Sequence, residues 1–330
     1  MPRPVNFREK FDRFYDSGCS IINLMVREKA FGEYRAAEIE DGAVTISVTE
    51  LGATMRSLTF AGEERIIGFQ KPEEYLQSPC YVGGIVGRFA GRIAGATARI
   101  GDKKIFLIPN ENENHLHGGQ YAFDKRKWAM EIVSDKSVKF TLVSQDLDNG
   151  YPGNLTAHVT YTVNGNELLI EFEGESDADT VFGPTTHIYF KPGALGSALQ
   201  VNMRIAADQY VAVNEELLPT EIKPCAGKYD FRTMRQIGEN VDNCFVLNGT
   251  HAACFRTNTM QTDLYTDYPG MTLYTGANLS GALRPNEGFA VEPMYYPDSP
   301  NHPEFPSPVL QAGKRFSKYA RYVFTPVKSA

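Results

Sequence analysis

The stretch of sequence that decides the fold covers residues 158–170 and reads HVTYTVNGNELLI. Apolar side chains recur at every second position before the turn Asn164-Gly165-Asn166, and a β-prone apolar run follows it. A period of two is typical of a strand with one buried face. An Asn-Gly pair between two such runs indicates a tight hairpin. The stretch therefore predicts two neighbouring antiparallel strands.

The same pattern continues on both sides of this hairpin. A second turn, Gly101-Asp102, separates two further β-prone runs. Further predicted strands lie at residues 44–48, 128–132, 199–205, 271–274 and 321–324. After residue 30 the only helical signal is a short turn at residues 72–75, which disfavours an α/β fold with a parallel sheet. The chain is therefore predicted to be all-β, a large antiparallel β-sandwich. Without an internal repeat or linker, residues 1–330 are expected to form a single domain.

Residues 1–30 have a different pattern. Phe7, Phe11, Phe14 and Tyr15 follow helical spacing between charged residues, which predicts a short amphipathic N-terminal helical segment. We expect it to pack on the main body as a lid or strap, and a partner-binding helix is the alternative.

Composition excludes several classes of function. The formal net charge is -7 and no dense Lys/Arg run occurs, so no nucleic-acid partner is expected. Five scattered cysteines without CxxC spacing predict neither a disulfide framework nor a cysteine-rich zinc site. No run approaches the ~20 apolar residues that span a bilayer, and the apolar patch at residues 21–26 is too short for a signal peptide. A cytoplasmic protein with no membrane partner is expected, with leaderless export as the alternative.

Residues 289–294, FAVEPM, place one carboxylate, Glu292, inside an apolar strand. Burial would raise its pKa, and such a group needs either a partner or a chemical role. A structural ion pair and a catalytic base are both open at this point.

Three other segments carry polar groups in unusual settings. Residues 83–93, GGIVGRFAGRI, bring small residues beside Arg88 and Arg92, which can hold a turn or bind a ligand oxygen. Residues 110–119, NENENHLHGG, place His115 and His117 on one face if the segment is a strand, a weak metal signal. Residues 182–190, FGPTTHIYF, place His187 in a β-prone strand, where it is either a core histidine or a proton donor.

Taken together and in order, these segments resemble the aldose 1-epimerase (galactose mutarotase) family. The resemblance covers about residues 36–325. It also includes GYPGN at 150–154, YDFR at 229–232, Asp242, YTG at 274–276, and Pro297-Asp298.

The resemblance implies a β-sandwich with an open sugar cleft and neither cofactor nor metal. It assigns Glu292 as the base that takes the proton of the anomeric hydroxyl and His187 as the acid that protonates the ring oxygen. It places Arg92, His117 and Asp242 as residues that bind sugar hydroxyls. The implied activity is interconversion of the α and β anomers of a free aldose, and we expect Glu292 and His187 on opposite sides of a sugar-sized cleft. The expected partner is a small sugar, and the expected assembly is a monomer or homodimer.

Three segments depart from the family pattern: Gly91, where Asn is usual, Lys191-Pro192, where Asn-Leu is usual, and Asn243, where His is common. We expect all three beside the sugar, where they would affect specificity. Two other readings remain open. One is a sugar-binding or sensing protein that does not turn its ligand over. The other is a metal-dependent β-sandwich enzyme that uses His115, His117, His187 and Glu292.

Overall fold

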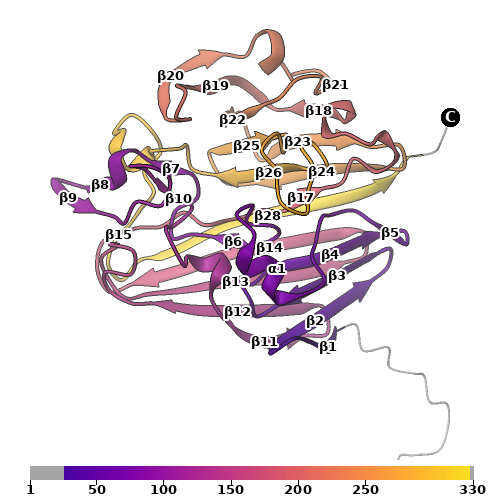
Figure 1. Ribbon diagram of the computed structural model, residues 1–330, viewed down its shortest axis with the longest axis horizontal. Helices are drawn as coiled ribbons and strands as arrows, with labels where there is room; N and C mark the ends of the chain where they lie inside the picture. Colours follow the sequence, from indigo (N-terminus) through magenta and orange to yellow (C-terminus); the bar gives the residue numbers. More distant parts are fainter. Residues whose placement is uncertain (1–25, 328–330) are drawn as a thin grey trace, which may run out of the picture.

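A computed structural model describes residues 26–327 of the chain, which form an all-β architecture (Figure 1). All of the named strand pairs in this part are antiparallel, so the predicted fold class is confirmed. In Figure 1 strands β1–β4 and β11–β14 gather in the lower part of the view, and β18–β26 in the upper part.

Three sheets contain most of the strands. The five-stranded sheet has the order β1 (Val26–Phe31), β2 (Tyr34–Asp41), β3 (Val44–Thr49), β4 (Met55–Phe60), β5 (Glu63–Glu64). The nine-stranded sheet has the order β11 (Ala129–Ser134), β12 (Ser137–Ser144), β13 (Leu155–Asn164), β14 (Glu167–Ser176), β28 (Arg315–Pro326), β24 (Met260–Thr266), β23 (His251–Arg256), β18 (Asn202–Ile205), β21 (Arg235–Gln236). The six-stranded sheet has the order β17 (Tyr189–Phe190), β26 (Phe289–Met294), β25 (Gly270–Tyr274), β22 (Asp242–Leu247), β19 (Ala207–Val213), β20 (Pro219–Pro224).

Short elements connect these sheets. Four two-stranded ladders pair β10 (His115–Leu116) with β7 (Arg92–Ile93), β15 (Thr180–Val181) with β27 (Val309–Leu310), β16 (Thr185–Thr186) with β6 (Ile85–Val86), and β8 (Thr97–Ile100) with β9 (Lys103–Phe106). The described α-helix is α1 (Pro72–Gln77), at the predicted helical turn. The 3₁₀ turns are η1 (Ala94–Ala96), η2 (Phe123–Lys125), η3 (Gly193–Leu195), η4 (Ala198–Gln200), η5 (Gly227–Tyr229), η6 (Ser299–Asn301).

The hairpin at residues 158–170 is the β13–β14 pair, in register from Leu155 opposite Ser176 to Asn164 opposite Glu167. Along β13 the side chains alternate between buried and half-buried, as the sequence period requires. Gly165 takes φ +62° in the turn, and its amide donates to the carboxylate of Asp41, the last residue of β2. The hairpin tip is therefore joined to the first sheet.

Two predicted segments differ from the structure. Residues 1–25 lie outside the described residues, but residues 26–30, which we assigned to the helical segment, belong to strand β1. Cross-strand pairing stabilises this strand, because Arg27 bonds both Glu38 and Glu40 on β2. In the predicted strand 199–205, only β18 is extended. Its start is the 3₁₀ turn η4, which the Ser197 side chain caps by accepting from the Leu199 amide.

The largest buried apolar cluster is continuous across the three large sheets. It contains side chains from β3, β13, β26 and β28, among them Ile46, Tyr161, Val291 and Phe324. The free thiols in the described part are Cys80, Cys225, Cys244 and Cys254, all buried. Among the described residues no helix is long and apolar enough to cross a membrane.

Candidate active site

A cavity of about 220 Å³ opens beside the six-stranded sheet and contains all five site residues predicted from the sequence. Strands β22, β25 and β26 form one side of it. The β7–β10 ladder, the segment between β16 and β17, and loop residues such as Tyr81 and Pro297 also line it. The predicted residues in its lining are Arg92, His117, His187, Asp242 and Glu292.

Strand alternation explains how a carboxylate reaches this cavity from an apolar strand. On β26, Phe289 and Val291 point into the main core, whereas Glu292 and Met294 line the cavity. On the paired strand β25, Leu273 faces the same core and Thr272, opposite Glu292, lines the cavity. All six residues of β26 are buried, so Glu292 lies on the floor of the cavity.

His187 is held by its backbone between β16 and β17. Its amide donates to the Gly84 carbonyl at 2.9 Å, and its own carbonyl accepts from the Gly83 amide at 2.8 Å. The rings of Tyr81 and Tyr189 lie 5.9 and 4.8 Å from the imidazole, centroid to centroid. The Gly-Gly segment thus fixes where this histidine points.

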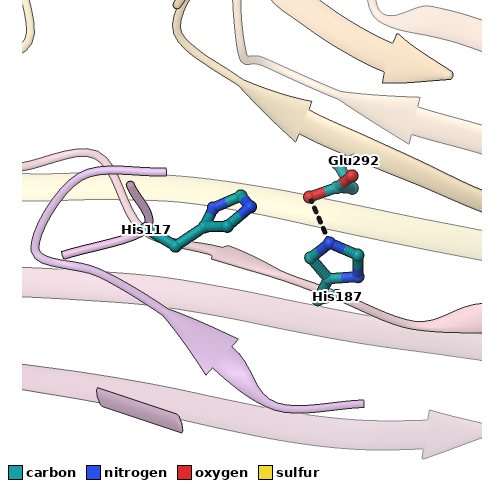
Figure 2. Close-up of side chains that lie close together, drawn as sticks. All are labelled: His117, His187 and Glu292. Carbon is teal, nitrogen blue, oxygen red and sulfur yellow. Dashed lines mark ion pairs between the residues drawn. The ribbon is translucent and has the colours of Figure 1, made fainter. Parts of the chain in front are cut away.

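Glu292 and His187 form a buried pair, drawn in Figure 2 with a dashed line. Glu292 Oε2 lies 3.7 Å from His187 Nε2, and both side chains are over nine-tenths buried. Neither Glu292 Oε2 nor His187 Nδ1 has a hydrogen-bond partner among the described residues. The two groups are neighbours, not on opposite sides of a sugar-sized cleft as we expected from sequence. A substrate must therefore present adjacent atoms to the pair.

Burial sets the protonation of this pair, because a low dielectric disfavours the charged form of each group. It raises the pKa of Glu292 to about 8, with Asp242 adding to the effect and Arg92 opposing it. It lowers the pKa of His187 to about 4. Between these values the pair holds one proton, and the two pKa values place it on Glu292.

His117 faces the same pair, as Figure 2 shows, and a backbone amide fixes its tautomer. The Gly91 amide donates to His117 Nδ1 at 3.1 Å, and the His117 amide donates back to the Gly91 carbonyl at 3.1 Å. A ring nitrogen that accepts a hydrogen bond cannot carry the proton, so in the neutral ring the proton is on Nε2. Burial lowers the pKa of His117 well below its ordinary value and keeps the ring neutral. Its remaining ring nitrogen is therefore a hydrogen-bond donor.

The tautomer of His117 also decides whether this ring can bind a metal ion, as the metal-dependent alternative requires. One ligand atom each from His117, His187 and Glu292 lies within 4.8 Å of the others. However, a metal on Nε2 of His117 would need the ring proton on Nδ1, facing the Gly91 N–H. His115 is also engaged elsewhere: Nδ1 bonds the Ile108 carbonyl at 2.6 Å, and Nε2 bonds the Tyr151 hydroxyl at 2.9 Å.

His115 and His117 were expected on one face of a strand, and they do not share one. Strand β10 ends at Leu116, and His117 takes φ +53°, which turns it away from His115.

The two arginines of residues 83–93 have different surroundings. Arg88 is 2% exposed and its guanidinium donates to four carbonyls and two hydroxyls. Arg92 reaches the cavity and forms a two-pronged ion pair with Glu111, at 2.7 Å from Nε to Oε2 and 2.8 Å from Nη2 to Oε1. Arg88 thus holds loops together, and Arg92 lies where a ligand can contact it.

Several residues that line the cavity were not predicted from the sequence. One of the three departures from the family pattern, Lys191-Pro192, was expected beside the sugar and lies elsewhere. Tyr81 and Glu111 line the cavity, although only the NENENHLHGG segment offered any signal for Glu111. Asp242, at the start of β22, is half-buried, and burial raises the pKa of its carboxyl. Gly91 and Asn243 line the cavity as expected, but Lys191 does not; it lies over a separate depression with Arg56.

This chain is similar to known proteins of one family. The family model described as Aldose 1-epimerase matches residues 35–323. Galactose mutarotase from Homo sapiens is 30% identical, covering 89% of this chain and 95% of that protein. Aldose 1-epimerase from Escherichia coli (strain K12) is also 30% identical, over 88% and 95%. The solved structure of galactose 1-epimerase from Lactobacillus acidophilus NCFM is 27% identical, with a TM-score of 0.83 over 92% of this chain and 98% of that one.

Proposed function

Because this chain belongs to the aldose 1-epimerase family and interconverts the α and β anomers of a free aldose, we propose that Glu292 and His187 carry out the proton transfers. The observation that carries this proposal is the buried pair at 3.7 Å, on the floor of a cavity of monosaccharide size. The anomeric hydroxyl and the ring oxygen are both bonded to C1. A neighbouring base and acid can therefore reach both oxygens from one side.

The reaction proceeds by ring opening and reclosure. Ionised Glu292 takes the proton of the anomeric hydroxyl while protonated His187 delivers its proton to the ring oxygen, and the C1–O5 bond breaks. The C1 aldehyde then rotates about the C1–C2 bond. For closure, His187 takes the proton of the O5 hydroxyl and Glu292 returns its proton to the carbonyl oxygen, which leaves the opposite anomer. One proton is taken and one is given in each direction.

Burial and substrate binding act on opposite halves of this cycle. Burial favours the uncharged pair, and this is the form needed for ring closure. Glu292 Oε2 has no partner among the described residues, so the anomeric hydroxyl of a bound sugar can donate to it. A hydrogen bond to the carboxylate stabilises its ionised form, which ring opening requires.

The other cavity residues bind and orient the sugar. His117 donates from Nε2. Because this ring lies beside Glu292 and His187, its N–H can stabilise negative charge that develops on the ring oxygen. The Asp242 carboxyl accepts from hydroxyls, and the Nη1 end of Arg92 donates to one. These roles need no metal or cofactor.

The test is mutarotation of freshly dissolved α-D-galactose and α-D-glucose, followed by polarimetry, in Glu292→Gln and His187→Asn variants. Each variant should lose at least ~10²-fold in kcat, the usual effect of removing a general acid or base. Sugar binding, measured by calorimetry, should change little. Near-normal turnover in either variant would mean that its role is wrongly assigned. Binding without turnover in the unmodified protein would instead support a sugar-sensing protein.

We also infer that the protein acts in the cytoplasm as a monomer or homodimer, without nucleic acid or membrane as partner. Its formal net charge of -7 opposes binding to polyanions, and buried free thiols suit a reducing compartment. Light scattering after gel filtration measures the assembly directly.

A further inference from the structure

Among the described residues that line the cavity, Arg92 is the single arginine or lysine. Its guanidinium already forms an ion pair with Glu111. Both Nε and Nη2 donate to the Glu111 carboxylate, at 2.7 and 2.8 Å. The side chains are 19% and 31% exposed, so the ion pair is sheltered from water. Two parallel bonds of this kind are the arrangement that a guanidinium would offer to a ligand carboxylate. That face of Arg92 is therefore not available to a substrate.

The other carboxyl groups of the cavity add no further cation. Asp242 and Glu292 join Glu111 in the lining, so the cavity contains three carboxyl groups and one guanidinium. A sugar hydroxyl can donate to any of these carboxyls. A carboxylate carried by the sugar would instead meet the Glu111 carboxylate and find the Nε–Nη2 side of Arg92 already bonded, and that costs binding energy.

The ion pair does not hold the surrounding loop in shape by itself. Backbone bonds join Glu111 and Asn114 in both directions, and the Asn110 side chain bonds the amide and carbonyl of Leu116. Leu116 also pairs with Arg92 in the β7–β10 ladder. The loop is thus closed by contacts that do not involve the Glu111 side chain, which leaves that side chain available for a role toward the substrate.

We propose that Glu111 determines substrate specificity by occupying the Arg92 fork, which restricts the site to uncharged aldoses. When Glu111 is neutralised, the same guanidinium can bind the carboxylate of a uronic acid. This inference rests on the proposed function, because it requires the sugar to bind in this cavity.

The test compares D-galactose with D-galacturonate, which differ only in the oxidation state of C6. Anomer exchange is measured by NMR for the unmodified protein, Glu111→Gln and Glu113→Gln. Glu113 is an exposed residue of the same loop, so its variant matches the charge change away from the cavity. In Glu111→Gln the kcat/KM ratio of galacturonate to galactose should rise at least about tenfold, as one regained charge-assisted bond allows. In Glu113→Gln the ratio should stay within about twofold.

A double variant separates the freed arginine from a general charge effect. In Arg92→Gln/Glu111→Gln the gain should disappear, and a gain that persists there overturns the proposal. An unchanged ratio in Glu111→Gln, with galactose still turned over, also overturns it and leaves the proposed function intact. Absence of galactose turnover in the unmodified protein would instead reject the proposed function. If circular dichroism shows that Glu111→Gln is unfolded, Glu111→Ala takes its place with the same outcomes.

Discussion

Burial raises the pKa of Glu292 and lowers the pKa of His187, and as a consequence the two side chains share one titratable proton. The pKa of Glu292 is raised to about 8 and that of His187 is lowered to about 4. Activity requires the pair to hold one proton, whichever group carries it.

This sharing predicts a bell-shaped pH profile. Below about pH 4 His187 takes up a second proton and the pair has no base, and above about pH 8 Glu292 loses its proton and the pair has no acid. We expect kcat/KM to fall outside these limits, measured by polarimetry after subtraction of the spontaneous rate at each pH. A flat profile from pH 3 to 10 would contradict the shared-proton mechanism.

Ionisation of Glu292 also makes the stability of the folded protein depend on pH. Glu292 ionises near its ordinary pKa of 4.5 when unfolded and near 8 when folded, so between these values the folded state binds more protons. Its contribution is fully present below pH 4.5 and is lost as pH rises through 8. Glu292→Gln, which cannot ionise, should therefore gain stability relative to the unmodified protein over this interval.

At the scale of the element, strand β26 gives neighbouring residues separate roles. Val291 is 1% exposed in the main core, while Glu292 lines the cavity. This separation arises because successive side chains of a strand point to opposite faces.

Alternation on β26 predicts that stability and catalysis can be changed independently. Val291→Ala removes two buried methyl groups and should lower the free energy of unfolding by about 2 kcal/mol. Its turnover below the melting temperature should stay within about threefold, because Glu292 keeps its backbone position. Urea denaturation and polarimetry on the same samples check both. A loss of turnover as large as that of Glu292→Gln would show that the two faces are coupled.

At the scale of the whole molecule, the core does not divide between the sheets. A single apolar cluster extends from the first strands to β28, and Glu292 and His187 lie more than a hundred residues apart in the chain. We propose that the chain folds as a single domain, because neither half could bury its share of this cluster alone.

A shared core predicts one cooperative unfolding transition. Tryptophan fluorescence reports on Trp128, the protein's one tryptophan, in the part of the chain that includes β11–β14. Far-UV circular dichroism reports on all strands. The two should give coincident urea transitions. Separate midpoints would show that the sheets unfold as independent units.

The sequence by itself determined the fold class, the main hairpins and five of the residues that line the cavity. Alternation and turn residues are local signals, so they identified β3, β13, β14 and β26, and the ordered motifs identified Glu292, His187, Arg92, His117 and Asp242 as cavity residues. It did not determine that His115 and His117 turn apart, because that depends on one positive φ angle and on Tyr151, a distant partner. Only the tertiary structure decided the 3.7 Å distance between Glu292 and His187, the tautomer of His117 and the Glu111 partner of Arg92. Distances and pKa shifts arise from contacts between segments far apart in the chain, and local pattern carries no information about them.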